Sequence, residues 1–179
     1  MVRRHPRVSI GIPVFNGERF LGETLESILG QTYDDLEIVI SDNASTDGTA
    51  DICTAAARRD SRVFYHRNPH NLGIAPNCNR AFALATGEFY KLADYDDLLA
   101  PEFVSRCVEG LDAHPGAAVC FPRTRLIDDE GRIVGEFEPP ASACSPDAHV
   151  RFRSLVLEPD HIVSQASGLM RSALVRQTV

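Results

Sequence analysis

Three carboxylates lie within four residues, at Asp94, Asp96 and Asp97, directly after the apolar run 89–93. Aromatic and apolar residues in that order are typical of a short buried strand. Clustered carboxylates repel one another unless a cation or hydrogen-bond donors offset the repulsion. Their hard oxygens suit Mg²⁺ or Mn²⁺, ions that commonly join a protein to a diphosphate. The spacing indicates a candidate metal site, although a solvated acidic turn before a helix explains it equally well on its own.

A second polar stretch, 41–49, follows another apolar run at 36–40. Asp42 stands at the strand end, where its carboxylate can accept a hydrogen bond from a ring N–H and so select a uracil or guanine edge. We expect this position to aim Asp42 at the ligand crevice. Asp47 precedes a helix, and we expect it to cap that helix or to order the loop.

The elements that must position these residues alternate between strand and helix. Apolar runs predict strands at 7–14, 36–40, 62–66, 89–93 and 117–121, and helical spacing predicts helices at 20–29, 49–59, 77–85 and 101–113. A hairpin at 123–134, a loop at 136–147, a helix at 151–157 and a strand at 168–171 follow. This alternation predicts an α/β fold with a mainly parallel sheet, whose ligand sites lie at the carboxyl ends of the strands.

Composition narrows the class of protein. The 179 residues suffice for one domain with a real core, and a net charge of −7 argues against a nucleic-acid binder. The five cysteines form no CxxC pair, which indicates a reducing compartment. We find no signal peptide and no apolar run of membrane-spanning length, so we expect a cytoplasmic protein, with peripheral membrane attachment of a full-length form left open.

Five motifs occur in register between residues 8 and 125. They are SIGIPVFN (9–16), LESILGQTY (25–33), DNASTDGT (42–49), NLG (71–73), and ATGEF (85–89) followed by DYDD (94–97). Together they resemble the family 2 glycosyltransferases. The resemblance implies a GT-A fold, which is a Rossmann-like three-layer α/β/α arrangement, and a nucleotide-diphosphate sugar donor. It also implies Mn²⁺ or Mg²⁺ bound through the DxD motif and transfer with inversion at the anomeric carbon.

The resemblance assigns roles by position. The implied substrate-binding residues are Pro13, Phe15, Asn16, Asp42, Asn71, Gly73 and Asp94, the first four of which would line the nucleoside pocket. Asp96 would ligate the metal, and Asp94 would contact the ribose or hold metal-bound water. Asp97 would either orient Asp96 or approach the donor sugar.

The chain departs from the family pattern in two places. Cys78 stands before Asn79 where many relatives carry arginine, so a phosphate-facing cation is either absent or replaced by Arg80. The acceptor-side acidic residue should follow the strand at 168–171, near where the sequence stops. We therefore expect a single domain over 1–179 that is truncated at its acceptor-side end and lacks the general base.

Two functions remain open at this point. One is metal-assisted, inverting transfer of a sugar, most simply from a UDP-sugar, to a glycan, lipid-linked or protein acceptor. The other is a nucleotide-sugar and metal-binding module without transferase activity. The clustered proton acceptors left in the acceptor-side half are Glu158, Asp160 and His161. A truncated end should also leave apolar surface at Leu169, Met170, Leu174 and Val175 poorly covered and favour self-association.

Overall fold

The computed structural model describes residues 5–137, 142, 145–157 and 168–177. Its strands are β1 (Val8–Val14), β2 (Leu36–Asp42), β3 (Val63–Arg67), β4 (Phe89–Leu92), β5 (Val119–Cys120), β6 (Thr124–Ile127), β7 (Ile133–Phe137) and β8 (Leu169–Arg171). Its helices are α1 (Leu21–Leu29), α2 (Thr49–Arg59), α3 (Ile74–Leu84), α4 (Phe103–Ala113), α5 (Ala148–Leu157) and α6 (Ser172–Val175). In the described part of the chain, no helix is both long and apolar enough to span a bilayer.

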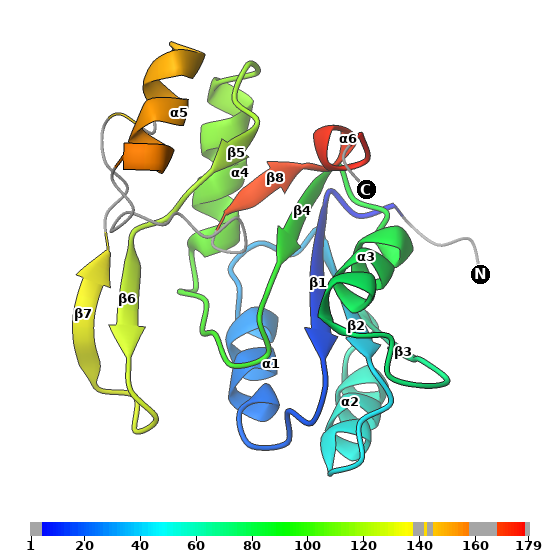
Figure 1. Cartoon of the computed structure of the whole chain (residues 1–179). Coiled ribbons are helices and arrows are strands. Elements are labelled where there is room, and N and C mark those ends of the chain that lie inside the picture. Colours follow the sequence, from blue (N-terminus) through cyan, green and yellow to red (C-terminus); the bar gives the residue numbers. More distant parts are fainter. Residues whose placement is uncertain (1–4, 138–141, 143–144, 158–167, 178–179) are drawn as a thin grey trace.

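The main sheet has six strands in the order β3-β2-β1-β4-β8-β5. β1 pairs in parallel with β2 and β4, and β2 pairs in parallel with β3. Only β8 runs antiparallel to its neighbours, β4 and β5. The predicted α/β fold with a mainly parallel sheet is confirmed, and β6 and β7 form a separate hairpin beside it (Figure 1).

Two helical layers cover the sheet (Figure 1). On one face, apolar residues of α1, α2 and α4 share a core with Ile10, Ile38 and Phe89. On the other face, Phe82 of α3 packs against Tyr90 of β4 in a second cluster. Phe89 and Tyr90 face opposite layers because successive side chains of a strand alternate. The result is the three-layer α/β/α arrangement that the sequence predicts.

Several element boundaries differ from the predictions. α3 begins at Ile74, three residues before the predicted start, because Pro76 is tolerated in a first turn where backbone N–H groups have no intrahelical partner. The strand predicted at 117–121 is shorter, Val119–Cys120, and its two residues pair with Met170 and Leu169 of β8. The helices predicted to begin at 101 and 151 begin instead at 103 and 148.

The apolar surface predicted at the end of the chain is largely absent. Leu169 has no exposed surface, because β8 pairs between β4 and β5. Met170 and Val175 pack against the cluster formed by Phe82 and Tyr90. Leu174 alone among the four named residues is exposed, at 42%. The expectation of a poorly covered apolar patch is therefore wrong, and the argument for self-association falls with it.

Candidate functional site

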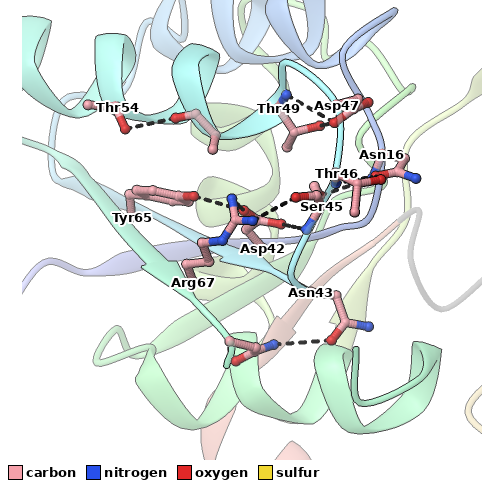
Figure 2. Close-up of polar contacts among 12 residues, drawn as sticks. Asn16, Asp42, Asn43, Ser45, Thr46, Asp47, Thr49, Thr54, Tyr65 and Arg67 are labelled. Carbon is pink, nitrogen blue, oxygen red and sulfur yellow. Dashed lines mark hydrogen bonds and ion pairs between the residues drawn. The ribbon is translucent and has the colours of Figure 1, made fainter. Parts of the chain in front are cut away.

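The loops that follow β1 and β2 are joined by hydrogen bonds (Figure 2). Asn16 adopts a positive φ of 54°, which turns its backbone N–H toward Ser45 Oγ at 3.0 Å. The Asn16 side-chain oxygen accepts the backbone N–H of Thr46 at 2.8 Å. Phe15, the residue before this turn, is 41% exposed at the carboxyl edge of the sheet. The structure therefore brings the predicted residues of β1 and the 42–49 loop together.

Asp42 has no exposed surface. Its Oδ1 accepts the backbone N–H of Ser45 at 2.8 Å, and its Oδ2 accepts the Tyr65 hydroxyl at 2.8 Å and the Arg67 guanidinium at 3.2 Å (Figure 2). The expectation that the strand end aims Asp42 at the crevice is wrong in this geometry, because donors from β3 draw the carboxylate inward. Burial beside this carboxylate also raises the pKa of Tyr65 to about 12.

Asp47 orders its loop as predicted. Its Oδ1 accepts the backbone N–H of Thr49 at 3.1 Å and the Thr49 hydroxyl at 2.6 Å, next to the start of α2. Its Oδ2 accepts the backbone N–H of Glu18 at 3.1 Å, which ties the β2 loop to the β1 loop. These bonds hold the pKa of the Asp47 carboxyl below its usual range despite the opposing effect of desolvation.

A network of asparagine side chains supports the neighbouring loop at 68–73. Asn43, which is 3% exposed, donates to Asn71 Oδ1 at 2.8 Å and accepts the Leu72 backbone N–H at 2.8 Å. Asn77 in α3 is also buried and accepts a hydrogen bond from Asn68 at 2.8 Å. Sequence reasoning picked out Asn71 but missed Asn43 and Asn77. A buried amide in a helix carries no sequence signal beyond its polarity at an inward position.

The acidic cluster follows β4 at the same edge of the sheet, and helix α1 holds the loop that carries it. The Thr24 hydroxyl donates to the carbonyl of Tyr95 at 2.8 Å. The Ser27 hydroxyl accepts the backbone N–H of Leu99 at 3.1 Å, and the Gln31 amide donates to the carbonyl of Ala100 at 2.8 Å. The Thr24 and Ser27 hydroxyls of α1 and the Gln31 amide, two residues beyond the helix end, thus hold the acidic loop at three points.

The three carboxylates of this loop are exposed, and the pKa values of two of them are raised. Desolvation raises the pKa of Asp94, and the charge of Asp96 raises it further. Desolvation also raises the pKa of Asp97, as do the charges of Asp94 and Asp96. The described residues contain no group of three potential metal ligands in coordinating proximity. One or two carboxylates with a diphosphate completing the shell is the usual Mg²⁺ arrangement, so this donor set fits a divalent ion held jointly with substrate.

A cavity of about 590 Å³ opens beside the cluster. Asp96 and Asp97 line one side, and Phe103 at the start of α4 lines another. Arg123, just before the hairpin strand β6, and Arg125, within that strand, line the side next to the hairpin. The cavity thus lies between the carboxylates and the hairpin.

The structure describes the first departure from the family pattern, at Cys78, but not the residues of the second, the candidate general bases. Cys78 is half-buried, and its thiol pKa is raised by burial and by the charge of Asp94. The Arg80 guanidinium is exposed and lies 3.2 Å from His66 Nε2 on β3, and its replacement of the arginine stays a prediction. The candidate bases Glu158, Asp160 and His161 lie outside the described residues.

Comparison with known proteins identifies the family of this chain. The Glycosyl transferase family 2 profile matches residues 9–174. The glycosyltransferase EpsE of Bacillus subtilis is 37% identical over 127 residues, which are 70% of this chain and 46% of EpsE. The chain therefore spans less than half the length of this relative.

Two solved structures resemble the fold. Residues 1–349 of Staphylococcus aureus TarS, in complex with UDP, superpose with a TM-score of 0.77 at 22% identity, over 96% of this chain and 48% of that one. The mannosyltransferase PcManGT of Pyrobaculum calidifontis, in complex with GDP-Man and Mn²⁺, gives a TM-score of 0.60 at 28% identity, over 70% and 37%. The fold is therefore GT-A, and the chain belongs to glycosyltransferase family 2.

Proposed function

We propose that this chain supplies the donor site of a metal-assisted, inverting glycosyltransferase that uses a UDP-sugar. The acceptor would be a hydroxyl group of a glycan, a lipid-linked glycan or a protein. The observation that carries the proposal is the Asp94, Asp96 and Asp97 cluster, which lies at the carboxyl edge of β4 beside the loops of β1 and β2. Structures of TarS with UDP and UDP-GlcNAc, and of PcManGT with GDP-Man and Mn²⁺, support a nucleotide-sugar donor and a divalent ion.

The acidic loop would do the chemical positioning. Asp96, with Asp94, would hold Mn²⁺ or Mg²⁺ against the donor diphosphate. A bound ion supplies Lewis-acid stabilisation of the charge that develops on the leaving nucleoside diphosphate. Asp97 borders the cavity, where its carboxylate could accept hydrogen bonds from the hydroxyl groups of the transferred sugar. Because α1 fixes the loop, these carboxylates need little reorganisation when substrate binds.

The loops of β1, β2 and β3 would hold the nucleoside. Exposed Phe15 offers an aromatic face, and Pro13 and Asn16 shape the same edge. Asn71 and Gly73 are exposed in the third loop, where Asn71 Oδ1 fixes the turn by accepting the Gly73 N–H at 2.8 Å. Contact between Asp42 and a base ring stays a prediction, and it would require the 42–49 loop to open because the carboxylate is buried.

Calorimetry with UDP tests the proposal. Binding should be clear with Mn²⁺ and weak with EDTA, because the clustered carboxylates repel a diphosphate in the absence of a cation. Asp96→Asn should weaken Mn²⁺-dependent UDP binding by at least about tenfold, since even outer-shell partners of a metal are worth that much. Asp97→Asn should weaken it less. Asp51→Asn, which alters an exposed carboxylate in α2, is the matched control and should bind as the unaltered chain does.

Equal UDP affinity in Mn²⁺ and EDTA would contradict the metal-site assignment. The activity itself is tested by sugar transfer to a glycan acceptor. Donor hydrolysis without transfer would favour the binding-module alternative for this chain.

A further inference from the structure

Lys91 is the single lysine of the chain, which also has seventeen arginines. It occupies the third position of β4, three residues before Asp94, and is 1% exposed. Strand alternation places it on the same face as Phe89, toward α4, at a position where an apolar side chain would be expected. Burial of an ammonium group is strongly unfavourable unless the surroundings compensate for it, so this position requires an explanation.

The ammonium group lies beneath the acidic loop. Lys91 Nζ donates to the carbonyl of Leu92 at 2.8 Å and sits 5.7 Å from the centre of the Phe103 ring. The side chain borders the 590 Å³ cavity together with Asp96 and Asp97. A flexible four-carbon stem lets the ammonium reach this position at the cavity wall.

Electrostatic coupling links this ammonium to the carboxylates. Burial lowers the pKa of Lys91 to about 8, while the charges of Asp97 and Asp94 oppose that change. In return, Lys91 lowers the pKa of both carboxyls, against the desolvation and mutual repulsion that raise them. Lys91 is thus a cation that is already in place next to a cluster expected to receive a divalent ion.

We propose that Lys91 is the resident counter-cation of the acidic cluster and makes the site bind a divalent ion jointly with a diphosphate rather than the ion alone. This inference rests on the proposed function. Three carboxylates and one ammonium carry two net negative charges, which a divalent ion neutralises. A diphosphate then meets a neutral site. Without the ammonium, the ion is held more tightly, but one negative charge remains and repels the diphosphate. Lys91 is therefore a positioning residue whose removal shifts two affinities in opposite directions.

The test compares Lys91→Met with the unaltered chain by calorimetry, first with Mn²⁺ alone and then with UDP added to the Mn²⁺-loaded protein. Lys91→Met should bind Mn²⁺ about 5- to 30-fold more tightly and UDP weaker by a similar factor, as expected for one charge in a partly hydrated site. Lys91→Arg keeps the charge and borders the cavity, so both of its affinities should stay within about threefold of the unaltered chain. A purely structural role would lower both affinities in both variants.

If the Mn²⁺ and UDP affinities of folded Lys91→Met both decrease, or if neither changes, the proposal is overturned. So would a Lys91→Arg variant that behaves as Lys91→Met does. Lysine labelled with ¹³C at Cε gives one side-chain NMR signal in this chain, independent of any variant's folding. That signal should shift on titration with Mg²⁺ and saturate with the affinity that calorimetry gives for Mg²⁺. An unchanged signal would also overturn the proposal. If the unaltered chain shows no metal-dependent UDP binding, the proposed function itself fails.

Discussion

Replacing Asp42 with alanine removes a buried acceptor that serves three donors. The Ser45 N–H belongs to a residue that is 2% exposed, so its loss of a partner should cost about 1–3 kcal/mol. The Tyr65 hydroxyl loses a bond to a charged acceptor, typically worth about 1.5–3 kcal/mol. The Arg67 side chain is 44% exposed, so solvent screens its ion pair and the pair adds little.

These contributions are not additive, because all three donors share one carboxylate. We therefore expect Asp42→Ala to lower the free energy of unfolding by about 3–5 kcal/mol, because the Ser45 N–H and the Tyr65 hydroxyl both lose a buried acceptor. Asp42→Asn keeps an oxygen for the Ser45 N–H but turns an amide toward Arg67 or Tyr65, so its loss should be about half as large. Asp51→Ala, an exposed carboxylate in the first turn of α2, should cost about 1 kcal/mol or less.

Urea unfolding of the four proteins, monitored by circular dichroism, gives these differences directly. UDP binding should be measured on the same samples at a temperature where each variant is folded. If Asp42→Ala unfolds within about 1 kcal/mol of the unaltered chain while UDP binding is lost, the structural reading of the buried carboxylate is refuted. Base recognition would then be its main role.

Two further predictions concern stability. Because the pKa of Asp97 is raised, its ionised form opposes folding, and the stability contributed by its protonated form is lost as the pH rises through that pKa. In EDTA, Asp97→Asn should therefore have a higher melting temperature than the unaltered chain at pH 7. The difference should vanish below about pH 4, where Asp97 is protonated in the folded and the unfolded chain. An equal gain at both pH values would contradict this cause. Gly11→Ala should destabilise the fold, because its Cβ would overlap the Tyr90 hydroxyl. Gly22→Ala in α1 meets no atom within 4 Å and should raise the free energy of unfolding by up to about 1 kcal/mol. Similar melting temperatures for these two variants would show that β1 and β4 can separate without cost.

The correct predictions rest on patterns that are local in the sequence. The strand at Phe89–Leu92 and the carboxylates after it are adjacent in sequence, so hydrophobic periodicity and residue type suffice to place them. The bonds of Asp47 to Thr49 span two residues and follow from the preference for capping residues before a helix. The parallel direction of β1, β2, β3 and β4 follows from the helices between successive strands.

The incorrect predictions depend on contacts between distant segments. Asp42 was expected to point into the crevice, because its partners Tyr65 and Arg67 are more than twenty residues away, on a strand whose register the sequence does not show. Leu169 looked uncovered because the antiparallel insertion of β8 between β4 and β5 has no local signal. The burial of Lys91 was not predicted for a similar reason, because it depends on the packing of α4 over β4.

The most direct test of the central claim is a crystal structure with Mn²⁺ and UDP, with data collected at the manganese absorption edge. We predict an anomalous peak within direct coordination distance of the Asp96 carboxylate, in contact with the diphosphate, and beside the cavity that Asp97 lines. A peak elsewhere on the chain, or UDP bound at the β1 and β2 loops without a manganese signal at Asp96, would contradict the account.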